Sequence, residues 1–200
     1  MATPGQLVQV MADALGVPKA TVVQYDRVLA ENGFRSKHGR GTSAAKVTSR
    51  DAANLLTAIG ASSPLGLSAK DAVEACRKFA SLISVGPAGA KREMSKLGLE
   101  KLASLPDGHS FENALSALIE CGGQREFSAL GDSSVWVQFI GPATSAQIVI
   151  GSHLFGNYAD AQKYKRSPRT RVGRGLVHAS SVTTPAIRAL GALVAGEATR

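Results

Sequence analysis

No feature of the sequence limits the possible fold as much as the tripeptide Gly16-Val17-Pro18, which interrupts the apolar periodicity of the N-terminal third. Glycine favours the left-handed conformation that ends helices, and proline suits the first position of a new helix. The sequence therefore predicts two amphipathic helices joined by a short turn. Apolar residues recur at helical spacing on both sides of the turn, at Leu7, Val10, Met11 and Ala14 and at Val22, Tyr25, Val28 and Leu29.

The flanks of this helix pair carry their own start and stop signals. Thr3-Pro4 combines a capping residue with a proline at the first helical position, and Asn32-Gly33 predicts the end of the second helix. Residues 34–47 then place two short flanks around the basic, glycine-rich stretch KHGRG, which predicts a hairpin with an exposed tip. The periodic stretch Thr48–Gly60 predicts a third helix.

The remainder of the chain changes from helical periodicity to strand periodicity. Helices are expected at 68–83, at 91–104 with Gly98 as a weak point, and from Phe111 onward. The β-branched and aromatic stretches VWVQFI and AQIVI flank the five-residue loop Gly141–Ser145, which predicts an antiparallel hairpin with Val135, Val137 and Phe139 on one face. A third strand is expected at Gly175–Val182 and a capped helix at the C-terminus.

The helix pair has the residue types of a known DNA-binding motif. The spacing Ala12-x3-Gly16-x5-Val22 resembles the helix-turn-helix of bacterial and phage regulators over about residues 8–28. The resemblance extends through Gly41 to the winged variety, because the basic hairpin follows the second helix. The resemblance implies a winged helix-turn-helix at the N-terminus. Together with the helix and strand patterns of the rest of the chain, it predicts an α+β fold class, with a helical middle and a small C-terminal antiparallel sheet with helices.

The predicted domain division follows the same pattern. Residues 1–60 would form the winged helix-turn-helix DNA-binding domain, and 61–105 a linker and helical segment, with Ala61–Leu67 as the linker. Residues 106–200 would form an α+β domain for dimerisation or a second DNA contact. Because few residues precede the first helix, the helix at Arg50–Ile59 is expected to supply the third element of the N-terminal core.

Polar residues on the second helix are candidates for base reading. If Val22 points into the core, the opposite face carries Lys19, Ala20, Val23, Gln24 and Arg27. In a major groove Gln24 can pair with adenine, Arg27 with guanine or phosphate, and Ala20 or Val23 with a thymine methyl group. The other reading of this face is a solvated amphipathic surface. On the wing, phosphate or the minor groove would be reached by Arg35, Lys37, His38 and Arg40.

The charge distribution points to a polyanionic partner. The formal net charge is +8. Residues 1–60 carry seven Lys/Arg and four Asp/Glu, residues 111–160 carry one and five, and residues 161–200 carry eight and one. Clustered cations gain free energy from counterion release on nucleic acid. The C-terminal cluster is expected on a long loop, with Tyr158 and Tyr164 nearby for base stacking, and comprises Lys163, Lys165, Arg166, Arg169, Arg171 and Arg174. The alternative is a solvated loop.

Other function classes find little support in the sequence. No apolar run approaches the roughly 18–20 residues that span a membrane, and no signal peptide is recognisable. The histidines are scattered without metal-ligand spacing, so no metal is expected. The stretch SAAK lacks the companion motifs of Ser-x-x-Lys enzymes and GRGLVH lacks the third glycine of a dinucleotide fingerprint, so neither an enzyme nor another cofactor is expected. Cys76 and Cys121 are expected to be small buried side chains in a protein of a reducing bacterial cytoplasm.

These observations lead to three hypotheses. The first is a sequence-specific transcriptional regulator of bacterial or phage type that binds double-stranded DNA as a homodimer or higher oligomer. The second is a phage DNA-packaging or recombination accessory similar to a small terminase subunit. The third is an adaptor whose basic surface binds an acidic protein.

Overall fold

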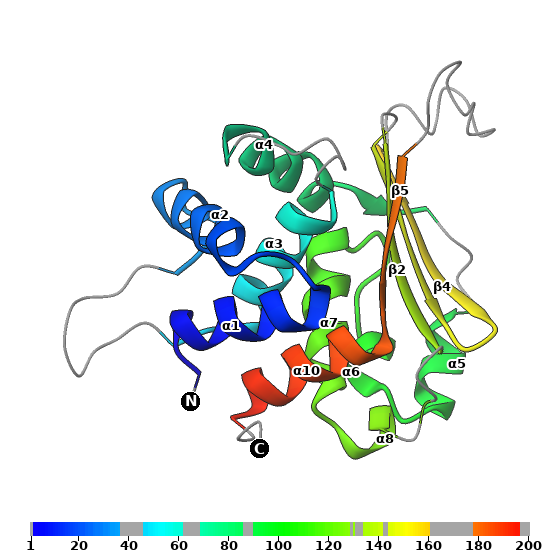
Figure 1. Cartoon of the computed structure of the whole chain (residues 1–200). Coiled ribbons are helices and arrows are strands. Elements are labelled where there is room, and N and C mark those ends of the chain that lie inside the picture. The colour runs from blue at the N-terminus through cyan, green and yellow to red at the C-terminus, as the bar shows by residue number, and fades with distance from the viewer. Residues whose placement is uncertain are drawn as a thin grey trace.

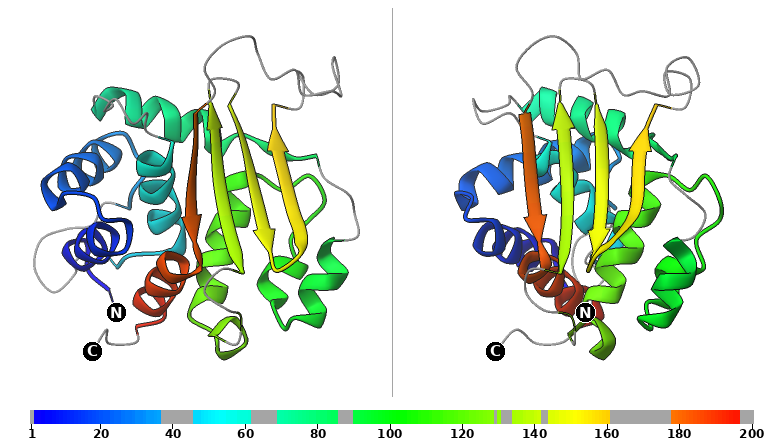
Figure 2. Two further views of the ribbon diagram at one scale, coloured as in Figure 1. Left: turned by 45° about the vertical axis from the view of Figure 1, so that its right-hand side comes forward. Right: turned by 90° about the vertical axis from the view of Figure 1, so that its right-hand side faces the viewer.

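The molecule has a layer of helices packed on one face of a single antiparallel sheet (Figures 1 and 2). The structure is a computed structural model, which describes residues 2–36, 46–61, 69–85, 90–128, 130, 134–141, 144–160 and 178–196. The predicted α+β class and the antiparallel sheet are confirmed. The arrangement of a winged helix-turn-helix stays a prediction, because the wing residues Lys37, His38 and Arg40 lie outside the described residues.

The sheet has five strands in the order β1-β4-β3-β2-β5, and every neighbouring pair is antiparallel. The predicted hairpin is formed by β2 and β3, and the predicted third strand is β5. The strands β1 and β4 were not expected. The bounds are Ile83–Ser84 (β1), Val135–Gly141 (β2), Ser145–Ile150 (β3), His153–Ala159 (β4) and His178–Thr183 (β5).

The apolar alternation of the sheet decides which face meets the helices. Val135, Val137 and Phe139 of β2 are buried, whereas Trp136 between them is exposed. Strand β4 lacks such a regular alternation because a bulge shifts its register beside Ile148 and Val149. Because of this irregularity, the sequence of β4 lacks the period-two pattern by which a strand is predicted.

The helices of the N-terminal half follow the predicted boundaries closely. Both α1 and α3 begin with a capping box, in which Thr3 and Gln6 or Thr48 and Asp51 exchange hydrogen bonds with each other's backbone. These elements are α1 (Pro4–Leu15), α2 (Lys19–Glu31), α3 (Ser49–Gly60) and α4 (Ala69–Ala80).

The helix expected over 91–104 is broken. Gly98 adopts φ 73°, a left-handed conformation that ends the first piece. The structure therefore has two short helices where one was predicted. The elements of the C-terminal half are α5 (Ala90–Lys96), α6 (Glu100–Ala103), α7 (Phe111–Gly122), α8 (Arg125–Ser128) and α10 (Thr184–Ala195).

One continuous apolar core contains residues of the described helices and of strands β2 to β5. Helix α7 lies at its centre, with α3 and α10 against it, and α1 packs on α10 (Figure 1). The α7–α10 contact is close because Gly191 lies directly on the backbone of Gly122 and Gly123. Buried side chains of 1–60, such as Met11 and Leu56, belong to the same core as Leu115 and Ile187. The predicted division into three domains stays a prediction, but no break in the core accompanies it.

Candidate nucleic-acid interface

The turn between α1 and α2 has the geometry that its sequence predicts. Gly16 adopts φ 65° and ψ 29°, the left-handed conformation that residues with a Cβ rarely adopt. The amide of Val17 donates to the carbonyl of Ala12 at 3.1 Å, and the carbonyl of Pro18 accepts from the amide of Thr21. Two helices are thus joined by Gly16–Pro18 alone.

Helix α2 divides into a buried stripe and an open surface. The stripe faces α1, α3 and α4 and contains Val22, Tyr25, Asp26, Leu29 and Ala30. The side chains of the other face are exposed, and 49% of the surface of Val23 is accessible. This outer surface consists of Lys19, Ala20, Val23, Gln24 and Arg27, the five residues that the sequence analysis assigns to base reading. Their role in binding stays a prediction.

The polar side chains of this outer surface contribute little to the fold. Lys19 and Gln24 make no hydrogen bond or ion pair with any residue that the structure describes. Arg27 forms an exposed ion pair with Glu31, one turn along the same helix, at 2.9 Å between Nε and Oε1. Exposed pairs of this kind contribute only about 0.3–0.5 kcal/mol. The helix would keep its packing if these three side chains were engaged elsewhere.

Arg35 differs from the other predicted contacts. Its Nε lies 2.8 Å from Oδ1 of Asp26, and both side chains are largely buried between α2 and the chain that follows it. Burial raises the pKa of the Asp26 carboxyl; the nearby Arg35 guanidinium opposes this rise, and Asp51 adds to it. The charge of Arg35 is therefore used inside the protein, and the prediction that it reaches phosphate finds no support in its position.

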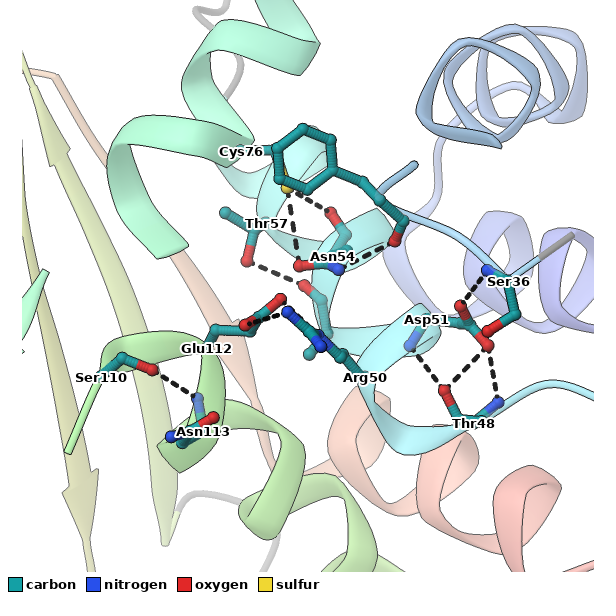
Figure 3. Close-up of polar contacts among 12 residues, drawn as sticks. Ser36, Thr48, Arg50, Asp51, Asn54, Thr57, Cys76, Ser110, Glu112 and Asn113 are labelled. Carbon is teal, nitrogen blue, oxygen red and sulfur yellow. Dashed lines mark hydrogen bonds and ion pairs between the residues drawn. The ribbon is translucent and has the colours of Figure 1, made fainter. Parts of the chain in front are cut away.

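Asp51 holds the two described chain ends that flank the basic segment 37–45 (Figure 3). Its carboxylate accepts from the amide of Ser36 at 2.8 Å, and from the amide and hydroxyl of Thr48 at 2.9 and 2.8 Å. Nearby, the side-chain amide of Asn54 donates to the carbonyl of Phe34. The segment carrying Lys37, His38 and Arg40 thus starts and ends at the N-terminus of α3.

The contacts by which Asp51 holds Ser36 and Thr48 together, which we call the Asp51 clamp, were not predicted from the sequence. A capping box is recognisable in TSRD, but its second function depends on Ser36, fifteen residues earlier. A neighbouring cation is also committed to the fold. Arg50 forms a two-pronged contact with Glu112 of α7, at 2.8 Å from Nε and 2.9 Å from a terminal guanidinium nitrogen (Figure 3).

The second predicted interface cannot be placed. All six cations between Lys163 and Arg174 lie outside the described residues, as does Tyr164. Tyr158 is described, and the suggestion that it stacks on a base is wrong because it is completely buried. Its hydroxyl donates to Nε2 of His109 at 3.0 Å, while Nδ1 of His109 donates to the carbonyl of Pro106 at 2.9 Å. Burial lowers the pKa of His109 and raises that of Tyr158.

Both cysteines are buried, as predicted. Burial raises the pKa of Cys76 to about 12 and that of Cys121 to about 11, so both are thiols at neutral pH. Within the described part of the chain, no cluster of three or more His, Cys, Asp or Glu side chains could hold a metal ion. The described helices include none with the length and apolar character to cross a bilayer.

Comparisons with models of protein families, with curated proteins and with solved structures found no significant match.

Proposed function

We propose that the protein binds double-stranded DNA in a sequence-specific manner through the outer surface of α2. The observation that carries the proposal is the composition of this surface, in which a cation, an amide and a large apolar side chain are exposed together on the N-terminal half of one helix. Lys19, Val23 and Gln24 supply these groups. Charge contacts phosphate, an amide reads adenine, and an apolar group meets the methyl of thymine.

The position of α2 supports access to a groove. The helix lies at the edge of the molecule, and α1, α3 and α4 pack on its other side (Figure 1). An α-helix with its side chains is about 10–12 Å wide, and the major groove of B-DNA is about 12 Å wide. Recognition helices of helix-turn-helix proteins present their N-terminal residues to base edges, which is the half of α2 that carries Lys19, Ala20 and Gln24.

The N-terminus of α2 offers a further contact for phosphate. Pro18 precedes the helix and provides no side-chain cap. Among the described residues, no group accepts a hydrogen bond from the amides of Lys19 and Ala20. Amides at a helix N-terminus and an adjacent ammonium group together favour an anion. Such a contact would fix the register of α2 on the backbone.

The biological role that fits this chemistry best is transcriptional regulation of bacterial or phage type. A base-reading helix on a basic protein would occupy an operator and compete with other proteins for it. The basic segment after Ser36 would add phosphate contacts beside the same groove, since Asp51 holds its ends next to α2 and α3.

The first experiment measures affinity for random-sequence duplex by fluorescence anisotropy over a series of salt concentrations. We expect affinity to fall with salt, and Lys19→Ala to reduce the slope by about one unit because one phosphate contact is lost. Lys96→Ala is the matched control, because it removes the same charge from an exposed side chain of α5. If Lys19→Ala and Lys96→Ala reduced the salt slope equally, binding would depend on net charge alone and not on the surface of α2.

The second experiment selects bound sites from a pool of random duplexes. Enrichment of a defined sequence would support base reading by α2. Absence of any binding to duplex at low salt would contradict the proposal and favour an acidic protein as partner.

A further inference from the structure

The outer face of the sheet is uncovered by any described element. The helices pack on the inner face, and Figure 2, right, shows the strands in front of them. Alternation and register define this outer face across the four longer strands. Trp136 pairs with Val149 and Thr183, and Val149 pairs with Leu154. These residues form one continuous row from β5 to β4, which we call the tryptophan row.

The tryptophan row is unusually apolar for a solvated surface. Trp136 is 38% exposed and Leu154 is 40% exposed, and they are two of the three large apolar side chains that stand out as exposed in the described part of the chain. The register places Val149 between them. Isolated apolar side chains on a surface are ordinary, whereas adjoining exposed apolar side chains are typical of interaction surfaces.

The next row carries side chains that both donate and accept hydrogen bonds. Gln138 pairs with Ser181 on one side and with Gln147 on the other, and Gln147 pairs with Asn157. Beyond this amide row, Ile140 pairs with Ala179 and Ser145. The face thus runs from an apolar row through an amide row to a smaller, largely apolar row.

None of the described residues in these three rows is ionisable. The chain as a whole has a net charge of +8, so this absence identifies the face at which a second copy would meet no like charge. In a two-fold interface, a residue near the axis faces the same residue of the partner. A residue farther from the axis faces a different residue of the same surface on the partner. Charged groups would repel there, whereas amides can pair with amides because each carries donors and an acceptor.

We infer that this neutral outer face is the surface through which two copies of the chain associate as a symmetric dimer. A two-fold axis in the plane of contact keeps the amide row on the amide row, whether the axis runs along the strands or across them. The axis along the strands also places Trp136 over the partner's Val149. Packed antiparallel sheets align in this way at about 10 Å separation, with their strands within about 30°.

The size of the face indicates a reversible dimer. Four strands about 4.8 Å apart and six residues long at about 3.3 Å each make a face of about 20 by 20 Å. Two such faces bury about 800 Å² in projection, which is less than the about 1,600 Å² of a standard interface. We therefore expect dissociation on dilution.

The dimer has a consequence for DNA binding that depends on the proposed function. Helix α2 lies on the side of the helical layer that is remote from the sheet (Figures 1 and 2). Sheet-to-sheet dimers would hold their two α2 helices at opposite ends, so they would engage two separate duplex segments. The sites selected by α2 would then lack two-fold symmetry.

The test uses Trp136 as its own reporter, because the chain contains one tryptophan. The full chain without DNA is examined by sedimentation equilibrium and by tryptophan emission from about 1 µM to about 1 mM, which covers reversible association. We expect the mass to double over the range in which the emission moves to shorter wavelength and iodide quenching decreases. A constant monomer mass with tryptophan open to iodide would overturn the inference.

Variants then assign the association to this face. Trp136→Lys and Gln138→Glu each place like charges across the axis and are expected to keep the chain monomeric, with far-UV circular dichroism checking the fold. Gln9→Lys adds the same positive charge as Trp136→Lys, at an exposed position of α1, and is expected to dimerise like the wild type. Dimers that persist in both face variants would overturn the assignment. If a single-stranded oligonucleotide quenched the emission of Trp136 while the chain stayed monomeric, the face would bind nucleic acid. That result would overturn the inference that a second copy of the chain occupies it.

Discussion

Helices α2 and α3 are neighbours in the chain and almost equal in length, with thirteen and twelve residues, but the protein uses them in opposite ways. Helix α3 is buried without interruption from Asp51 to Ala58, because α2, α4, α7 and the sheet surround it. Helix α2 buries one stripe and leaves the rest open. The protein therefore separates stability, which depends on α3, from a surface on α2 that the fold does not require.

The difference in burial between the two helices also explains why their polar side chains have different partners. The buried polar side chains of α3 have partners within the protein, as Asn54 donates to Phe34 and Thr57 donates to the carbonyl of Ala53. Lys19 and Gln24 of α2 have no such partner among the described residues. Polar groups that serve the fold and polar groups available to a ligand can thus be distinguished from the contacts that each makes.

The largest expected difference concerns core packing. Leu56→Ala in α3 removes a completely buried side chain and should reduce the free energy of unfolding by about 2–5 kcal/mol. Val23→Ala on the open surface of α2 should change it by less than about 0.5 kcal/mol. Urea unfolding followed by circular dichroism measures the free energy of unfolding of both variants. A large decrease for Val23→Ala would show that the fold requires the outer surface of α2.

The second prediction tests the clamp at the start of α3. Asp51→Ala leaves the Ser36 amide and both donors of Thr48 without their acceptor, so we expect a loss of about 3 kcal/mol in unfolding free energy. Hydrogen exchange at the Ser36 amide should also become faster. Asp13→Ala, which removes an exposed aspartate on α1, is the control and should cost less than about 0.5 kcal/mol.

The third prediction addresses the surface that the fold leaves open. Gln24→Ala should weaken binding to a selected DNA site by about 1–3 kcal/mol and leave binding to random duplex nearly unchanged, because only a base contact is lost. The exposed Gln9 of α1 provides the matched control, Gln9→Ala, with no expected effect. Equal weakening on both DNAs would reassign Gln24 to phosphate.

The smallest expected effect concerns the buried stripe of α2. The pKa of Asp26 is higher in the folded protein than its ordinary value, chiefly because the carboxyl is buried. The folded state therefore holds the proton more tightly than the unfolded chain, and this group reduces stability as the pH rises through the interval between the two pKa values. Asp26→Asn should remove that decrease. Parallel curves of unfolding free energy against pH for both proteins would contradict this account.

Local signals predicted much of the secondary structure. The boundaries of α1, α2 and α3 follow from Thr3-Pro4, from the Gly16-Val17-Pro18 turn, from Asn32-Gly33 and from apolar periodicity, all of which act within a few residues. The β2–β3 hairpin was predictable from its alternation. The exposure of Lys19 and Gln24 also followed from one assumption, that Val22 points inward.

Contacts between distant parts of the chain decided what these signals could not. The sequence determined an α+β fold, a tight turn at Gly16 and a second helix with a polar outer side, because propensity, capping and periodicity are local properties. Only the tertiary structure decided that Arg35 pairs with Asp26, that Tyr158 is buried against His109, and that β4 completes a sheet with a neutral face. In each case the deciding energy comes from burial and pairing with residues remote in sequence, which no local pattern records.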